Sequence, residues 1–517
     1  MPALNGSQMK NRIFTPLFCT AIAAVIGFYI LSHAHIAVII TIVSLLLSAL
    51  CFFRVVSMSS ERLTDNKEQM TINKGRFVFC DEKVSRFLHS FSFCCTVFSV
   101  GLVLGICAAE AGRNVVKFGI DEDKITGIEG VLLEDPRVLS SGTTMASVSL
   151  RNTAGRNMRV SSSGVITFFF PADSEDLFAR NLRECGRGTV IFAEGKLRSN
   201  ERGVTFSASS LHIVKPAPQI EQMRTGIRLN LMKRFDGKTW GGLALALLVG
   251  IRDNLDVNLT TLYRDAGLSY ILALSGMHLA VITALIAFLL KKPLGLKAAS
   301  ITGAVIISLY CLLVGPMPSL VRSAIMYLLG VLTIMAALPR KSMSILCLSF
   351  LIQIIITPAA GNSLSFILSY VALLGILVTS RQVSSLLSGL IPNFLLQPLS
   401  LSIGAFLATA GICGFSFGTI APIGIIAGLA IVPLTTVFMI GSMIWLLLDL
   451  FSISFILNLP LTWVYKSMEA VSSLAGYVPG IRINPVIILI VSVLLLTAIA
   501  VLDYRRQIAL LKLKPFN

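Results

Sequence analysis

The chain of 517 residues is 55% hydrophobic and only 13% charged, with a formal net charge of +17 at pH 7. A soluble globular protein carries about 25% charged residues. The deficit of charge, together with many apolar runs of about 18 residues or more, excludes an ordinary soluble protein and predicts a polytopic α-helical membrane protein. The basic excess lies mainly in residues 226–517. It fits either the positive-inside rule of membrane topology or a path for a polyanion.

Residues 1–111 predict N-terminal transmembrane helices that flank a cytoplasmic polar loop. Apolar runs cover Ile13–Leu31 and Ile36–Phe53, and a third run covers Phe87–Ala109. The first run resembles a signal peptide, but the second follows it almost at once, so a membrane-embedded helical hairpin is the better interpretation. The loop before the third run is rich in Lys and Arg, which predicts that it lies in the cytoplasm.

Residues 112–220 form the one sizeable soluble segment, and we expect it outside the cytoplasm. Five strand-like runs and a predicted helix at Ser174–Arg183 follow the order β-β-β-α-β-β. This is the order of an OB fold, a five-stranded, partly open barrel that often binds oligonucleotides. A plain small barrel that only braces the membrane part is the alternative. The strand-like runs are Ile125–Leu133, Thr144–Arg151, Met158–Phe170, Gly188–Leu197 and Gly203–Val214.

Residues 221–517 predict a second set of transmembrane helices. Lys and Arg fall in alternate connections, which places both ends of the chain in the cytoplasm. The segment 453–478 contains Lys466 and Glu469 and lies either across the membrane or along its interface. The predicted apolar segments are 268–290, 297–315, 319–338, 343–357, 364–380, 398–415, 421–448, 453–478 and 484–502.

Polar residues gather at the start of the apolar run that continues to Leu290. The stretch DAGLSYILALSGMH places Asp265, Ser275 and His278 there, with Gly276 between the last two. An ionisable group at membrane depth costs a few kcal/mol or more, so such residues indicate a functional site.

The segment Gly250–His278 resembles the competence domain of the ComEC family of DNA-uptake channels. Further segments that are similar to family motifs follow in the same order: PSLVRSAIM at Pro318–Met326, SFILSYVA at Ser365–Ala372 and GIIAGLAIVPL at Gly424–Leu434. An OB-like domain after N-terminal helices also fits the family. The resemblance implies a channel in the cell membrane that imports single-stranded DNA during natural transformation, without enzymatic activity of its own. It further implies an extracytoplasmic DNA receptor and a cytoplasmic helicase-like motor.

The chain departs from the family pattern in several places. Tyr270 stands where the family commonly has His, Ile367 where Gln is usual, and Gly428 where Asn is usual. Many family members also carry a metallo-β-lactamase-like nuclease domain. The His-x-His-x-Asp-His cluster of such a domain does not occur in this sequence. We therefore expect a nuclease, if one is needed, to be a separate chain. No Cys-x-x-Cys pair occurs, which argues against a zinc ribbon, and we expect no metal ion and no cofactor.

Arg322 is the best residue for contact with DNA phosphates in the membrane, because its guanidinium is always charged and matches phosphate geometry. Alternatively, Arg322 lies at the membrane interface or forms an ion pair with Asp265. We predict that Asp265, Ser275, Gly276, His278 and Arg322 form the DNA path or its gate.

Ser275 and His278 are three residues apart, so they share a helix face. This pair leaves open a membrane-embedded serine hydrolase, although no third, orienting carboxylate is evident. A transporter of another anionic solute is a further alternative, because the departures from the family remove polar groups.

In the OB-like domain, a DNA-binding surface is predicted at Arg151, Arg156, Arg159 and Phe168. Base stacking on an aromatic ring contributes about 1–3 kcal/mol. Strand alternation, however, buries at least one of the three phenylalanines Phe168–Phe170, and the small net charge of the domain favours a structural role.

Overall fold

The computed structural model describes residues 14–30, 100–139, 143–155, 158–170, 185–200, 203–338 and 341–482, with scattered positions between 484 and 498. The second predicted N-terminal span, the polar loop after it and the predicted helix at 174–183 lie outside these ranges. The chain divides into two compact units. One unit comprises residues 1–113 and 321–377, and the other comprises residues 114–320 and 378–517.

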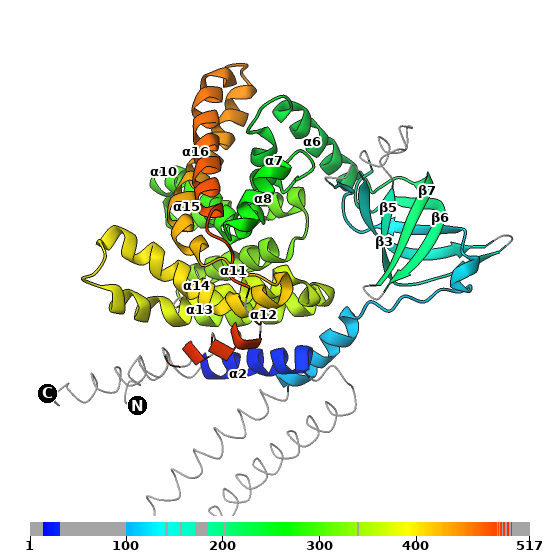
Figure 1. Cartoon of the computed structure of the whole chain (residues 1–517), viewed down its shortest axis with the longest axis horizontal. Coiled ribbons are helices and arrows are strands. Elements are labelled where there is room, and N and C mark those ends of the chain that lie inside the picture. The colour runs from blue at the N-terminus through cyan, green and yellow to red at the C-terminus, as the bar shows by residue number, and fades with distance from the viewer. Residues whose placement is uncertain are drawn as a thin grey trace, which may run out of the picture. The chain divides into compact units, whose positions relative to one another are not determined.

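A β-barrel forms one part of the second unit (Figure 1). Strand β1 pairs with both β3 and β6, β6 pairs with β7, and β7 pairs with β5, which returns to β3. The β5–β7 ladder is parallel, and the other four ladders of this ring are antiparallel. This connectivity is the one expected for an OB fold. The strands are β1 (Gly127–Leu132), β2 (Arg137–Val138), β3 (Thr144–Ala154), β4 (Arg159–Ser161), β5 (Val165–Phe170), β6 (Val190–Asn200) and β7 (Gly203–Lys215).

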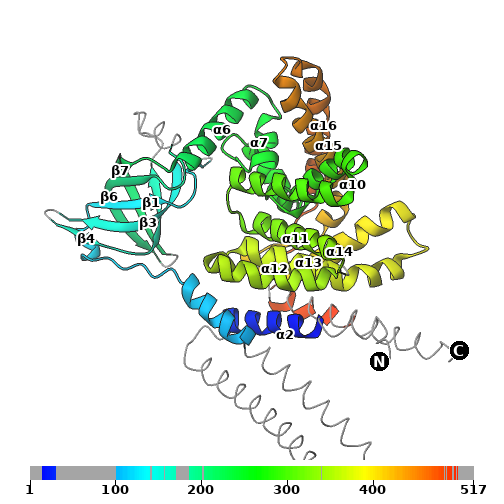
Figure 2. The same cartoon turned by 180° about the vertical axis from the view of Figure 1, so that it is seen from behind.

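Alternating side chains fill the barrel, whose strands are seen from both sides in Figures 1 and 2. In β5, Ile166, Phe168 and Phe170 point inward, and the residues between them are only partly buried. The ring of Phe168 packs against that of Phe206 with 4.9 Å between centroids. Each fully buried side chain of this size contributes about 1.5–3 kcal/mol. The all-β domain predicted from strand alternation is therefore confirmed, with β2 and the break between β4 and β5 as additions.

After the barrel, four helices lead to the membrane part of the second unit. They are α6 (Gln219–Phe235), α7 (Gly241–Val249), α8 (Val257–Asp265) and α9 (Ser269–Leu272). Their core is aromatic: the rings of Phe235 and Trp240 lie within 5.8 Å of each other, and Trp445 lies 5.4 Å from Trp240. The indole nitrogen of Trp445 donates a hydrogen bond to the Asn458 side chain at 2.8 Å. Burial of these aromatic rings stabilises this core.

Within the described part of the chain, five helices are long and apolar enough to cross a membrane. This confirms a polytopic α-helical membrane protein. They are α10 (Gly276–Val314), α11 (Pro318–Met335), α13 (Leu364–Leu387), α14 (Asn393–Phe417) and α15 (Ile423–Asp449).

Helix α10 replaces two predicted segments, 268–290 and 297–315. Pro293 lies inside this helix, and Gly295 has a φ of 76° that interrupts the helical backbone. Proline removes a backbone donor and glycine tolerates positive φ, so a bend there is expected. The sequence placed a connection at this point, and the structure makes it a kink. Residues 268–275, predicted as the start of the first span, form α9 and a short extended link instead.

The predicted segment 453–478 contains η4 (Ser454–Leu457) and α16 (Asn458–Gly476). Helix α16 packs against α15 and α8. It is not among the five long apolar helices, so its place in or beside the membrane stays a prediction.

In the first unit, α2 (Phe14–Val25), the π-helix η1 (Ile26–Ile30) and the helix Val100–Gly112 lie together. Gly101 and Gly105 approach the backbone of Thr20 and Ala24 so closely that a Cβ at either glycine would collide with it. This Gly-x-x-x-Gly spacing permits close helix packing in membranes. The helix α12 (Ser342–Ile356) and the 3₁₀ turn η3 (Pro358–Asn362) complete this core, and the Tyr29 hydroxyl donates to the Gly361 carbonyl at 2.7 Å.

Candidate functional site

The N-terminus of α10 is built around the Ser275 hydroxyl. Ser275 has an extended backbone and is the N-cap, and its Oγ accepts a hydrogen bond from the Met277 backbone N–H at 3.3 Å. The Ser275 backbone N–H in turn donates to Nδ1 of His278 at 3.1 Å. The two bonds make a capping box in which histidine takes the place usual for Glu or Gln. Gly276 is the first residue of the helix.

His278 is fully buried, and its two ring nitrogens have different surroundings. Nδ1 accepts from the Ser275 N–H and lies 3.2 Å from the Ser275 hydroxyl oxygen. Nε2 has no hydrogen-bond partner among the described residues. Because Nδ1 faces a backbone donor, the neutral tautomer carries its proton on Nε2. The structure therefore leaves one polar atom of His278 buried and unsatisfied, which is unusual and typical of functional positions.

The link that precedes Ser275 is held by its carbonyl groups. The Arg252 guanidinium donates to the Leu272 carbonyl at 2.8 Å, and the Ser319 hydroxyl donates to the Leu274 carbonyl at 2.5 Å. Burial, together with the nearby charge of Arg137, lowers the pKa of Arg252. These contacts fix a non-helical backbone at the start of a spanning helix, where free carbonyls would be costly in lipid.

Glycines let this region pack closely on α15. Gly267 adopts a φ of 70°, and a Cβ there would lie 2.8 Å from the Ala421 carbonyl oxygen. A Cβ at Gly424 would lie 2.9 Å from the Gly267 carbonyl oxygen. Two segments of the family resemblance, around 267 and around 424, are thus in direct contact.

Asp265 is not part of the Ser275–His278 arrangement. Its carboxylate is exposed and forms an ion pair with its neighbour Arg264 at 3.4 Å. Nδ1 of His278 accepts a hydrogen bond from Ser275, and Nε2 of His278 has no hydrogen-bond partner among the described residues. Asp265 therefore does not orient the imidazole. The structure therefore brings together Ser275, Gly276 and His278 and leaves Asp265 at the surface.

Arg322 is a buried guanidinium in the first unit, with 8% of its surface exposed. It stands over the Tyr370 ring at 5.8 Å from the centroid, and Nη2 lies 3.4 Å from the Ser323 hydroxyl oxygen. Within the ranges that the structure describes, no carboxylate forms an ion pair with it, and its Nε has no hydrogen-bond partner. Its surroundings are polar but neutral. The Tyr370 hydroxyl donates to the Gln353 side-chain oxygen at 2.9 Å and lies 3.4 Å from the Ser349 hydroxyl oxygen.

A buried ion network joins the barrel to the helices. Asp135, in the β1–β2 turn, forms ion pairs with Arg224 and Arg228 of α6. Arg228 also pairs with Asp253 after α7 at 3.0 Å, and Glu221 pairs with Arg224 at 3.0 Å. The two arginines and Asp253 are at most 13% exposed. This network was not predicted from the sequence, in which its signal is a pair of arginines one turn apart on α6.

The predicted DNA-binding residues of the barrel divide into three groups. Arg151 and Arg159 are exposed, as DNA contact requires. Phe168 is 0% exposed, so its choice as a stacking residue is wrong: β5 turns it into the barrel. Arg156 lies outside the described residues.

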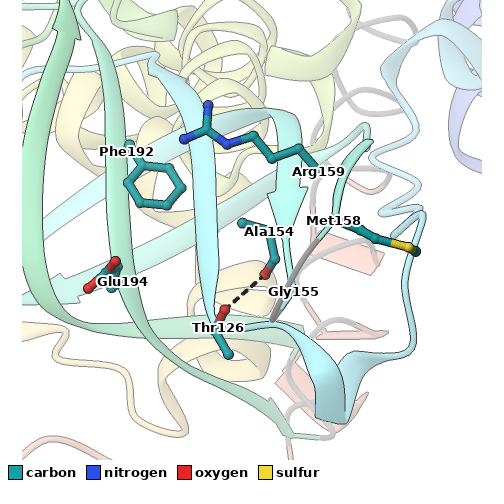
Figure 3. Close-up of a pocket in the computed structure, with 7 residues that line it drawn as sticks. All are labelled: Thr126, Ala154, Gly155, Met158, Arg159, Phe192 and Glu194. Atoms are coloured by element: carbon teal, nitrogen blue, oxygen red, sulfur yellow. Dashed lines mark hydrogen bonds between the residues drawn. The ribbon is translucent and has the colours of Figure 1, made fainter.

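A pocket of about 490 Å³ opens on the barrel surface beside Arg159 (Figure 3). The Arg159 guanidinium stands over the ring of Phe192 at 5.1 Å from its centroid. Phe192 was not predicted from the sequence, although its alternation with the buried Ile191 and Ala193 marks it as outward-facing. The pocket is lined by Thr126, Ala154, Gly155, Met158, Arg159, Phe192 and Glu194.

Comparison with known proteins identifies the helical part. Residues 247–506, half of the chain, match the family model described as Competence protein. The chain is 32% identical over 137 residues to the ComE operon protein 3 of Bacillus subtilis (strain 168), covering 25% of this chain and 17% of that protein. It is also 23% identical over 297 residues to an uncharacterized protein of Aquifex aeolicus (strain VF5), covering 57% of this chain and 69% of that protein.

The matched region contains the capped start of α10 and all five long apolar helices. With the composition, these helices make the protein a multi-pass protein of the cell membrane. Because the family model spans half of its length, the chain belongs to the competence protein family.

Proposed function

We propose that the protein carries single-stranded DNA across the cell membrane during natural transformation. The observation that supports this most is Arg322, a buried arginine on an apolar helix without a carboxylate partner among the described residues. An unpaired charge at such a place is costly, so it is expected to have a ligand of opposite charge. Guanidinium binds phosphate through two parallel hydrogen bonds, and a nucleic-acid strand carries one phosphate per nucleotide.

The surroundings of Arg322 fit a transient phosphate contact. Tyr370, Ser349 and Gln353 supply neutral hydrogen-bonding groups, so among the described residues a phosphate meets one positive charge and no ion-paired carboxylate. A channel must bind its cargo firmly enough to admit it and weakly enough to release it. One guanidinium with neutral neighbours meets both requirements better than a cluster of cations.

We propose a gating role for Ser275, Gly276 and His278. Their capping box closes the start of α10 with hydrogen bonds that a small rotation of the His278 ring would break. Asp265, at the exposed end of α8, is proposed to lie at the mouth of the path. The work of transport is expected to come from a cytoplasmic helicase-like motor, with a DNA receptor outside and a nuclease, if needed, on another chain.

The hydrolase alternative rests on the 3.2 Å contact of the Ser275 hydroxyl with His278. The same hydroxyl caps α10, and no carboxylate within the described ranges orients the imidazole, so the contact is better explained by the helix cap. A serine-directed fluorophosphonate probe tests this alternative: we expect no labelling at Ser275 in protein that supports uptake.

The main experiment measures entry of labelled DNA into a DNase-resistant form in whole cells. We expect Arg322→Ala to reduce uptake at least tenfold and Arg322→Lys to retain part of it, because lysine keeps the charge but not the forked geometry. Arg381→Ala removes an exposed arginine of α13 and is the matched control. Membrane levels of each variant are measured alongside.

Normal uptake in cells that lack this gene, or in Arg322→Ala cells with normal protein levels, would overturn the proposal. If cells that lack this gene took up DNA normally but no longer accumulated a small labelled anion, the result would support the alternative of a transporter for another anionic solute.

A further inference from the structure

The barrel pocket has a flat aromatic surface, which a path that binds phosphates does not require. Its floor is the Phe192 ring, which lies over β1 because Gly127 has no side chain: a Cβ there would be 2.7 Å from the ring. The Arg159 guanidinium covers the ring at 5.1 Å. A planar cation on a planar ring makes a flat surface on which a further aromatic ring stacks favourably.

Carboxylates surround this flat surface. Glu194 is exposed and lies two residues after Phe192 on the same face of β6 (Figure 3). Its Oε2 accepts a hydrogen bond from the Ser210 hydroxyl at 3.3 Å, which leaves Oε1 available. Glu129, which faces Phe192 across the β1–β6 ladder, lies 4.0 Å from Arg159. Two carboxylates near one guanidinium repel a phosphate and attract a neutral group that carries N–H donors.

A nucleobase fits these requirements, because it is flat, neutral and carries donors at its edge. Cytosine presents an amino group at ring position 4, and a carboxylate accepts from it. Uracil and thymine present a carbonyl oxygen at this position, which a carboxylate repels. The pocket volume of about 490 Å³ is ample for one base.

Resting on the proposed DNA-uptake function, we propose that this pocket receives one unpaired base of the incoming strand. The base stacks on Arg159 and Phe192, and Glu194 favours bases with an amino group. The backbone of the strand is held elsewhere, since the pocket itself has no excess of positive charge.

The test compares binding of two fluorescent 20-mers, oligo-dC and oligo-dU, to the full-length protein in detergent at pH 8. The two strands share the same backbone and differ in the base at ring positions 3 and 4. We expect wild-type protein to bind oligo-dC about fivefold or more tightly than oligo-dU. Glu194→Gln should bring this ratio close to one, because an amide both donates and accepts. Glu134→Gln, at an exposed carboxylate outside the pocket, should keep the wild-type ratio.

Phe192→Leu tests the stacking surface, since leucine preserves apolar contact with β1 but removes the flat ring. We expect it to weaken binding of both strands at least fivefold. Phe169→Leu is the matched control, because Phe169 is a partly buried phenylalanine on the outward face of β5 and does not line the pocket.

Equal binding of the two oligonucleotides by wild-type protein would overturn the proposal, as would an unchanged ratio in Glu194→Gln. Equal effects of Phe192→Leu and Phe169→Leu would overturn the stacking role. Each of these results leaves the uptake measurements with Arg322 variants unaffected, so failure of the pocket and failure of the DNA-uptake function are separable.

Discussion

The hydroxyl group of Tyr270 lies directly against Gly428: a Cβ placed on this glycine would be 2.8 Å from the tyrosine oxygen. Both positions depart from the ComEC pattern, in which His and Asn are usual. The structure shows that the two departures are in contact. Tyr270 on α9 is longer than the usual histidine, and its hydroxyl occupies space that a side chain at position 428 would need. The two departures therefore compensate for each other sterically.

We predict that substitutions at these two positions are coupled. Adding a methyl group with Gly428→Ala should be more favourable in a Tyr270→Phe background, because the hydroxyl that it meets is gone. A double-mutant cycle removes the intrinsic helix preference of alanine, and we expect a coupling free energy of about 1 kcal/mol. Unfolding of the purified protein in detergent measures it. The same cycle with Gly330→Ala, where a Cβ meets nothing within 4 Å, should give no coupling.

The ion network between barrel and α6 should contribute to stability. Of the ion-pair partners in the described ranges, Asp135→Asn leaves Glu221 for Arg224 and Asp253 for Arg228. Removing one partner of a buried pair is destabilising, and we expect a loss of about 2 kcal/mol, since Asp135 is 18% exposed and asparagine keeps one acceptor. The midpoint of thermal unfolding reports this loss. Asp123→Asn, at an exposed carboxylate of the same domain, should leave the midpoint unchanged; equal midpoints for the two variants would contradict a structural role of the network.

The cap of α10 predicts which substitutions of Ser275 are tolerated. Ser275→Ala removes the acceptor for the Met277 N–H and should cost about 1 kcal/mol of stability, whereas Ser275→Asp keeps an acceptor. We expect DNA uptake to be lowered in the alanine variant and largely retained in the aspartate variant. If Ser275 were a nucleophile, the result would differ, because the aspartate variant would be as inactive as the alanine variant.

Close packing of the helix Val100–Gly112 on α2 predicts strong sensitivity at Gly105. Gly105→Leu places a large side chain against the backbone of Ala24 and should destabilise the protein by about 3 kcal/mol. The amount of folded protein in membranes and its unfolding midpoint are the measurements. Gly226→Leu, on α6 with nothing within 4 Å of its Cβ, is the matched control and should have little effect. Similar losses at both glycines would argue against the close approach.

The parts of the fold that follow local patterns were predictable from the sequence. The runs predicted at Thr144–Arg151 and Gly203–Val214 agree with β3 and β7 within a few residues, and apolar length predicted the spanning helices. Local pattern also predicted that at least one residue of Phe168–Phe170 is buried, but not which ones. The register of β5 against β3 decides this, and it buries Phe168 and Phe170.

The contacts of the candidate sites depend on residues that are distant in the chain. Arg159 and Phe192 meet because β4 pairs with β3, β3 with β1, and β1 with β6, which no local pattern reveals. Arg322 meets Tyr370 through packing between α11 and α13. In contrast, Ser275 and His278 are three residues apart, and spacing predicted that they share a helix face; the structure brings them together through the cap of α10, with Ser275 extended. The kink at Gly295 lies where the charged residues Lys291, Lys292 and Lys297 predicted a connection between two apolar segments.

The parallel β5–β7 ladder leaves each of the five main barrel strands with a neighbour on both sides. Many receptors dock by contributing an extra strand to an open sheet margin. Among the described residues, however, that ladder joins only Thr167–Phe169 to Thr205–Ser207, so Ala208–Lys215 of β7 pairs on one side alone. A partner that binds this barrel by strand addition is therefore expected to use such a one-sided stretch, and any other partner to recognise the loops and outward side chains.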